Sequence, residues 1–115
     1  MNALVLAFLN SWRGLRHGAR TERAVRQELV LLAVGVPVAL LLGATLWVRV
    51  ALMVSLLLML AAEFLNTAVE KLCDHVHPSH HPMIGRVKDL ASAGTFMAQV
   101  AALLVWVAAL VERLG

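Results

Sequence analysis

The stretch "LVLLAVGVPVALLLGATLWV", residues 29–48, decides the class of this protein, because none of its twenty consecutive residues is charged. At a rise of about 1.5 Å per residue, such a helix spans the roughly 30 Å hydrocarbon core of a bilayer. Two further apolar runs follow, at 50–72 and 90–111. We therefore expect an all-α integral membrane protein with three transmembrane helices.

The overall composition agrees with this prediction. Hydrophobic residues make up 61% of the 115 residues, above the roughly 45–50% that is usual in soluble domains. The length allows one domain at most, so we treat 1–115 as a single membrane domain. Trp47 and Trp106 lie near the expected outer ends of the spans, where tryptophan commonly anchors a helix at the membrane interface.

The positive charges are distributed unevenly along the chain. Five of the ten Lys and Arg residues precede the first span: Arg13, Arg16, Arg20, Arg23 and Arg26. The first loop holds only Arg49, whereas Lys71 lies at the end of the second apolar run and Arg86 and Lys88 lie between the second and third. By the positive-inside rule, the N-terminus is cytoplasmic and the C-terminus lies outside. No aromatic residues interleave a basic patch, which argues against a nucleic-acid partner.

Residues 2–26 have the pattern of a helix that lies in the membrane surface. The apolar residues Leu4, Phe8, Trp12 and Leu15 recur at spacings of four, four and three, and the arginines fall largely on another side of the helix. Taken singly, these arginines are equally well explained as a basic topology anchor.

The segment 74–88 is predicted to be a short cytoplasmic loop. It contains four of the five histidines, at 75, 77, 80 and 81. Because no regular ligand spacing or partnering cysteine accompanies them, a solvated loop is favoured over a zinc site. Cys73 is the single cysteine, so no disulfide can form within the chain.

The second span carries acidic residues that a bilayer disfavours. Glu63 lies about 21 Å along a helix that starts after Arg49, and an acidic group at such a depth costs about 2.5–3.5 kcal/mol. Glu63, Thr67, Glu70 and Asp74 fall within about 60° of one another on a helix, with Asn66 about 60° to the side of Glu63. This polar stripe is expected to line an internal seam, either as interhelical hydrogen bonding or as a functional site.

The stripe needs a positive partner, because carboxylates at this depth must be neutralised or paired. A divalent metal suits hard carboxylate oxygens. The alternative is that Lys88 and Arg86 fold back from the loop. The segment "GRVKDLAS", 85–92, also offers Gly85 for a tight backbone and Asp89 as a helix N-cap. It fits a phosphate site and a simple cap equally well.

Four motifs together resemble the prokaryotic diacylglycerol kinase family. They are "NSWRGL" at 10–15, "ERAVRQE" at 22–28, "EFLNTAVEKLCD" at 63–74 and "GRVKDLASAG" at 85–94. The resemblance implies a homotrimer in the bacterial inner membrane, with sites at the cytoplasmic interface between subunits. It also implies transfer of the γ-phosphoryl group of MgATP to diacylglycerol, which yields phosphatidic acid.

The resemblance also assigns roles to individual residues. Glu63 would be the general base that takes the lipid hydroxyl proton, and Glu22 and Glu70 would hold Mg²⁺ on the nucleotide phosphates. Asn66 and Lys88 would contribute to catalysis. The remaining site positions fall into two sets, nucleotide-binding Asp74, Gly85, Arg86, Lys88 and Asp89, and substrate-side Ser11, Glu28, Glu63 and Ser92.

One segment departs from the family and two other functions compete with this one. The family often carries an acidic residue in the second loop, where this chain has "VHPSHHP" at 76–82. The nearest alternative function is the related undecaprenol kinase. A more distant one is a small oligomeric ion or proton pathway protein, in which buried carboxylates are also natural.

Overall fold

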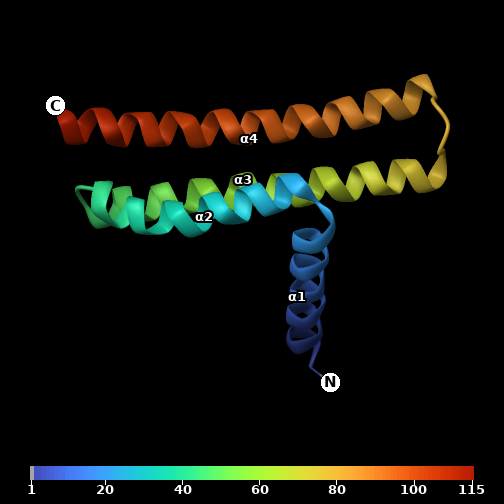
Figure 1. Ribbon diagram of the computed structural model, residues 1–115, viewed down its shortest axis with the longest axis horizontal. Coiled ribbons are helices and arrows are strands. Elements are labelled where there is room, and N and C mark those ends of the chain that lie inside the picture. The colour runs from blue at the N-terminus through green and yellow to red at the C-terminus, as the bar shows by residue number, and fades with distance from the viewer. Residues whose placement is uncertain (1) are drawn as a thin grey trace.

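The computed structural model describes residues 2–115, and these form four helices. They are α1 (Ala3–Thr21), α2 (Arg23–Leu42), α3 (Leu46–Val76) and α4 (Pro82–Leu114). The last three run along the long axis of the molecule, and α1 leaves this bundle at a wide angle (Figure 1). α2, α3 and α4 are each long and apolar enough to cross a membrane. The predicted all-α fold with three spans and a separate N-terminal helix is confirmed.

The chain turns sharply between α1 and α2, at Glu22. Glu22 has an extended backbone, with φ −117° and ψ 116°. The Arg26 guanidinium donates to the carbonyls of Ala19 and Arg20, at 3.3 and 3.0 Å, and so satisfies the end of α1. The predicted surface helix 2–26 is therefore too long, because α1 ends at Thr21 and residues 23–26 belong to α2.

The first span also ends earlier than predicted. α2 stops at Leu42, and Arg49 Nε donates to the carbonyl of Gly43 at 3.0 Å across the short turn. Thr45 caps the next helix by accepting from the Val48 amide at 3.3 Å. Residues 46–48, assigned to the first span because they are apolar, thus begin α3.

The loop between α3 and α4 covers residues 77–81 and not the predicted 74–88. α3 continues to Val76 and α4 begins at Pro82, a residue that suits the first turn of a helix because it lacks an amide N–H. His81 Nδ1 accepts from the Met83 amide at 3.1 Å. His81 is therefore the N-cap of α4 and Asp89 is not, because Asp89 lies inside the helix.

α3 is the central helix and packs against both α2 and α4. Its buried Leu52 and Leu56 pack in clusters with Ala39 of α2 and with Ala102 and Ala109 of α4. Small residues on the outer helices let the backbones approach closely, as is usual in membrane bundles. The core therefore runs along the apolar half of α3.

Only one of the two predicted interfacial tryptophans is exposed. Trp47 has 79% of its surface exposed. Trp106 instead faces the bundle, where its indole N–H donates to the Ser55 hydroxyl at 3.1 Å. The prediction that Trp106 is an interfacial anchor is therefore wrong. Its ring packs inside the bundle because the indole N–H finds a hydrogen-bond partner there.

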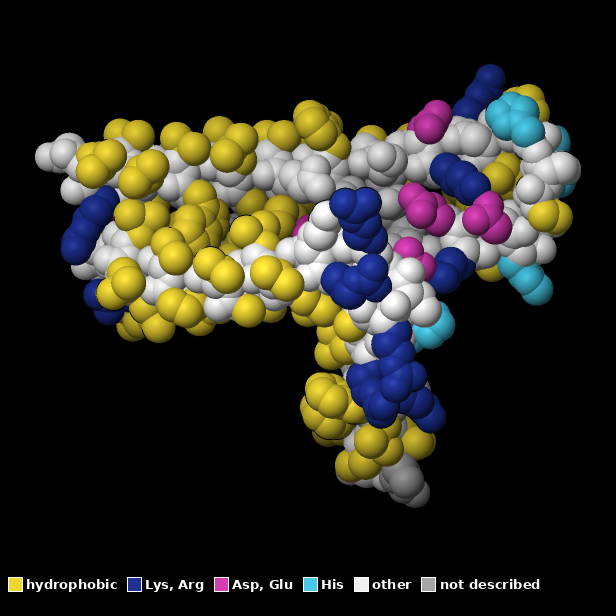
Figure 2. All heavy atoms as spheres, viewed as in Figure 1, with side chains coloured by type: hydrophobic (Ala, Val, Ile, Leu, Met, Phe, Trp, Pro, Cys, Tyr) yellow, Lys and Arg dark blue, Asp and Glu magenta, His cyan; other side chains and the backbone are white. Residues whose placement is uncertain are grey.

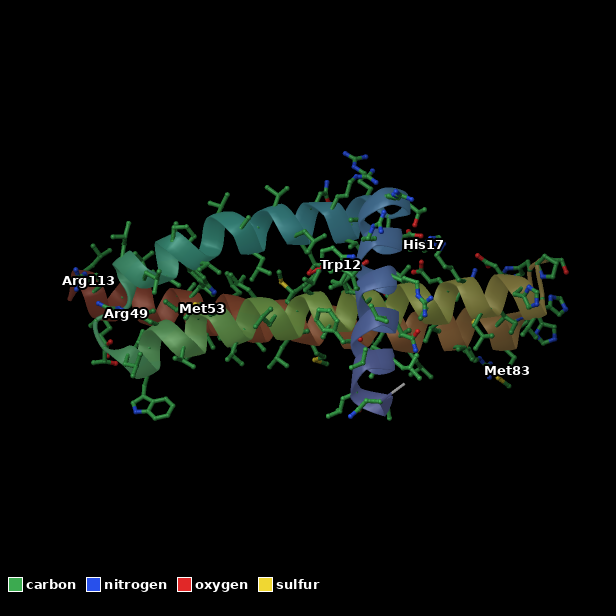
Figure 3. The ribbon with its side chains drawn as sticks, turned by 90° about the horizontal axis from the view of Figure 1, so that it is seen from below. Trp12, His17, Arg49, Met53, Met83 and Arg113 are labelled. Carbon is green, nitrogen blue, oxygen red and sulfur yellow. The ribbon has the colours of Figure 1, made fainter. Side chains whose placement is uncertain are left out.

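The two ends of the bundle differ in character. Arg49 and Arg113 lie at one end of the spans, and Met83 marks the opposite end (Figure 3). Hydrophobic side chains cover much of the visible bundle on the Arg49 side of α1, whereas Asp and Glu gather on the loop side (Figure 2). The polar functional groups are thus concentrated where α3 and α4 extend past α1.

Candidate functional site

Four carboxylates come together around the C-terminal half of α3, the half that leads to the 77–81 loop. Glu22 lies at the joint before α2, Glu28 on α2, and Glu63 and Glu70 on α3. Glu63 is buried, with 8% of its surface exposed. The charges of the other three lie near enough to repel that of Glu63. Residues that are far apart in sequence thus form one acidic group.

Two oxygen atoms in this region lack a hydrogen-bond partner among the described residues. They are Glu28 Oε1 and Asn66 Oδ1, and both are buried. The Asn66 amide donates to Glu70 Oε1 at 3.2 Å, so its nitrogen is satisfied while its oxygen is not. An unsatisfied buried oxygen costs about 1–3 kcal/mol. These atoms are therefore suited to accept a donor or a cation from a ligand.

Two lysines form the ion pairs of residues 2–115. Lys71 Nζ lies 2.9 Å from Glu22 Oε1. Lys88 Nζ lies 2.6 Å from Asp74 Oδ1 and joins the start of α4 to α3. Within the described chain, Glu28, Glu63 and Glu70 are left without a cationic partner. Lys88 does fold back onto the polar stripe, as one of the two sequence hypotheses has it, but onto its outer end.

The contact of Lys71 with the acidic group is a feature that sequence reasoning missed. Lys71 follows Glu70, lies about 100° from that residue around the helix, and so falls just beside the polar stripe. Its partner Glu22 precedes it by 49 residues. Glu22 at a helix boundary pairs with a basic residue of a different helix. Such a pair has no characteristic spacing, so a single sequence does not reveal it.

Near the loop, a hollow of about 110 Å³ lies between the end of α3 and the start of α4. Asp74, Gly85 and Lys88 line it together with residues 77–81. Gly85 and Lys88 are thus brought together with Asp74. Arg86 and Asp89 are exposed, and in residues 2–115 neither makes a side-chain hydrogen bond or ion pair.

Two predicted substrate residues lie outside this constellation. Ser11 is exposed on α1, and Ser92 is exposed on α4. Within the described range, no hydrogen bond links either hydroxyl to the acidic group. The structure therefore brings together the acidic residues with Asn66, and separately Asp74, Gly85 and Lys88, but it does not draw Ser11, Arg86, Asp89 or Ser92 into either set.

The donor atoms suit a hard divalent cation. Carboxylate and amide oxygens are the ligands that Mg²⁺ prefers, and Mg²⁺ typically takes only one or two protein carboxylates when phosphates supply the rest. Within residues 2–115, no three His, Cys, Asp or Glu side chains converge on one metal position. The two unpartnered oxygens beside Glu63 and Glu70 fit a cation that arrives with a phosphate ligand.

Comparison with known proteins gives a consistent result. Residues 9–110 match the family model described as prokaryotic diacylglycerol kinase. The chain is 35% identical over 105 residues to a diacylglycerol kinase of Escherichia coli strain K12, and the aligned region covers 91% of this chain and 86% of that protein. It is also 35% identical over 96 residues to the diacylglycerol kinases of Haemophilus influenzae and Pseudomonas aeruginosa. These matches cover 84% of this chain and 81% and 78% of the two relatives.

Three apolar helices with an acidic group at one end, together with these matches, define a multi-pass bacterial membrane enzyme that acts as a lipid kinase. The chain belongs to the prokaryotic diacylglycerol kinase family.

Proposed function

We propose that this chain transfers the γ-phosphoryl group of ATP to the primary hydroxyl of diacylglycerol, with Mg²⁺, and so forms phosphatidic acid. The observation that carries the proposal is the acidic group around Glu63, which includes three carboxylates without a cation in residues 2–115. Phosphoryl transfer requires positioning and charge neutralisation more than covalent chemistry. An acidic group awaiting a cation is suited to that task.

Glu63 is the proposed general base. It takes the proton from the lipid hydroxyl while the hydroxyl oxygen attacks the γ-phosphorus. The bond from that phosphorus to the β–γ bridging oxygen breaks, and ADP leaves with the bridging oxygen. Because Glu63 is buried among membrane helices, it can meet a hydroxyl whose acyl chains remain in the bilayer. A positioned base contributes about 10²–10⁴-fold to such a reaction.

Glu22 and Glu70 are the proposed holders of Mg²⁺. When bound with ATP, the ion neutralises charge on the phosphate oxygens. Glu22 lies on the joint between α1 and α2, and its present partner is Lys71. Binding therefore involves an exchange of one cation for another at Glu22.

The remaining residues divide between nucleotide and lipid. Asn66 lies beside Glu70 and has a buried oxygen without a partner in residues 2–115, and Lys88 provides positive charge for the phosphates. Asp74 and Gly85 share the loop hollow with Lys88, and Arg86 and Asp89 follow on the same helix. Ser11, Glu28 and Ser92 are assigned to the lipid side on family resemblance.

The proposal includes an assembly and an orientation. The active form is a homotrimer whose sites lie between subunits at the cytoplasmic face of the inner membrane. The N-terminus and the 77–81 loop are cytoplasmic, and the C-terminus is outside. In support, Arg49 and Arg113 lie at the opposite end of the spans from the 77–81 loop, whereas the other eight of the ten Lys and Arg residues lie on α1, at the start of α2 or on either side of that loop.

The test is an assay of purified full-length protein in mixed micelles with ATP labelled at the γ-phosphate. Diacylglycerol and undecaprenol are offered in competition. We expect label in phosphatidic acid that depends on Mg²⁺. Label mainly in undecaprenyl phosphate would replace diacylglycerol by the alternative substrate, and no label in any lipid would favour an ion or proton pathway.

A further inference from the structure

α1 carries a compact basic face. Arg13, Arg16, His17 and Arg20 line a shallow hollow of about 330 Å³ on this helix. Dark blue Lys and Arg side chains follow one side of α1, and yellow hydrophobic side chains follow the other (Figure 2). The helix therefore presents two distinct surfaces along its length.

The positive charge of this face is not compensated within the described chain. Residues 3–21 contain no Asp or Glu. The two ion pairs of residues 2–115 use Lys71 and Lys88 and leave all three arginines out. The Arg13 guanidinium donates to the Asn10 side chain, a neutral amide. Uncompensated guanidinium groups on one face attract an anion from outside the chain.

The position of this face relative to the apolar residues of α1 indicates which kind of anion it binds. At 100° per residue, the three arginines centre about 120° away from the exposed Leu4, Phe8, Trp12 and Leu15. Gly18 marks a third side, which packs against Phe64 of α3. When the apolar residues enter the acyl region, arginines beside them lie at the depth of the phospholipid phosphates.

We propose that the basic face of α1 binds the headgroups of anionic phospholipids. Guanidinium groups pair with phosphate oxygens through two parallel hydrogen bonds, which a compact ammonium group cannot do. Three arginines on one face then favour anionic over zwitterionic lipid beside α1. This inference concerns the lipid around the protein and stands independently of the proposed kinase reaction.

The test measures which lipids remain bound to the full-length protein. Protein reconstituted in vesicles of equal parts phosphatidylglycerol and phosphatidylcholine is extracted in mild detergent, and the retained lipids are counted by mass spectrometry. We expect the retained anionic lipid to exceed the zwitterionic lipid by about threefold or more, given the attraction of each basic residue for anionic membranes. R13Q/R16Q/R20Q lowers this ratio toward one.

Two variants serve as controls. R113Q removes one exposed arginine at the opposite end of the bundle and leaves the ratio as in the wild type. R13K/R16K/R20K keeps the charge and retains part of the enrichment, which separates charge from helix integrity. An unchanged ratio in R13Q/R16Q/R20Q overturns the proposal.

Two further outcomes are decisive. If R13Q/R16Q/R20Q retains the lipids but loses binding of a fluorescent ATP analogue, the face binds nucleotide and the lipid proposal is wrong. If that variant does not fold, the lipid ratio of the wild-type protein is measured at two salt concentrations instead. Raising the ionic strength from about 0.05 M to about 0.5 M shortens the screening length and lowers the ratio, and a ratio that does not respond contradicts headgroup binding.

Discussion

The four carboxylates of the acidic group differ in whether a positively charged side chain neutralises them. Glu22 has Lys71 as a partner, whereas Glu28, Glu63 and Glu70 have no cation within the described chain. The Lys71 side chain is about half exposed, at 52%, so its pair with Glu22 is reachable by solvent. Such a pair contributes at most about 1 kcal/mol. Under the proposed function, the divalent cation would therefore displace Lys71 from Glu22 at little cost.

Lys71→Met tests this exchange. Because the lysine no longer competes for Glu22, we expect the Mg²⁺ concentration for half-maximal phosphoryl transfer to fall by up to about fivefold, the factor that corresponds to about 1 kcal/mol. The measurement is a Mg²⁺ titration of transfer at saturating ATP. Lys71→Arg keeps the pair and serves as the control. A higher Mg²⁺ requirement in Lys71→Met would show that the lysine supports metal binding.

Glu70→Gln removes a proposed metal ligand while it keeps the size of the side chain. We expect the half-saturating Mg²⁺ concentration to rise by about tenfold or more, the loss typical even of groups that only support a ligand. The same titration measures it. The matched control is Glu112→Gln, an exposed glutamate near the C-terminus. An equal Mg²⁺ requirement in Glu70→Gln and wild type would remove Glu70 from the metal site.

The sequence predicted part of the site at this scale. The 3.6-residue period places Glu63 and Glu70 on one face, where Glu63 is buried between the helices and Glu70, nearer the loop, is exposed. The pairing of Glu22 with Lys71 joins two helices at an angle that the sequence does not encode locally. The free oxygens of Glu28 and Asn66 likewise depend on how the helices pack, so they emerged only from the structure.

At the scale of whole elements, the joint between α1 and α2 positions the site. Glu22 occupies the joint, and Arg26 holds the end of α1 through two carbonyls. α1 then docks with Gly18 against Phe64, the neighbour of Glu63. A Cβ atom at Gly18 would lie 2.6 Å from Phe64 Cε1, whereas one at Gly14 would have nothing within 4 Å.

Gly18→Val therefore disturbs this contact, and Gly14→Val in the same helix is its control. Both substitutions change helix propensity equally, so their difference reports packing. We expect Gly18→Val to be less stable than Gly14→Val by about 1–3 kcal/mol, the usual cost of overpacking. Thermal unfolding in detergent followed by circular dichroism measures the difference. Equal midpoints for the two variants would mean that α1 does not dock through Gly18.

The number and order of the helices were predictable, but several boundaries were not. Long apolar runs specify spans because lipid leaves backbone groups no partner except the helix itself. Polarity is a poorer guide outside the bilayer. Residues 74–76 and 82–88 were assigned to a cytoplasmic loop but are helical, since α3 and α4 continue beyond the long apolar runs. Pro82 was a usable signal for the start of α4, whereas capping by His81 depends on its ring orientation.

At the scale of the whole molecule, the chain exposes more apolar surface than one that folds in water. Exposed large side chains occur on each of the three spans, for example Leu41, Leu58 and Leu104. The spans also enclose an apolar groove of about 390 Å³ between α2, α3 and α4. Lipid or further subunits must cover these faces, which is compatible with the proposed homotrimer.

The trimer itself is a prediction about mass. Light scattering of the purified protein, corrected for bound detergent, should give three times the 12.5 kDa chain mass. Gly14→Val serves as a control, because a side chain at this position meets no atom of the same chain within 4 Å. A detergent-corrected mass of a single chain in a preparation that is catalytically active would contradict shared sites between subunits.

Glu63, buried in the acidic group, is the residue that we propose takes the proton of the lipid hydroxyl. The most direct measurement is lipid phosphorylation by Glu63→Gln, with nucleotide binding and thermal stability recorded on the same preparation. We expect transfer to fall by about 10²-fold or more, while the protein still folds and binds nucleotide. Turnover close to that of the wild type in Glu63→Gln would contradict this proposal.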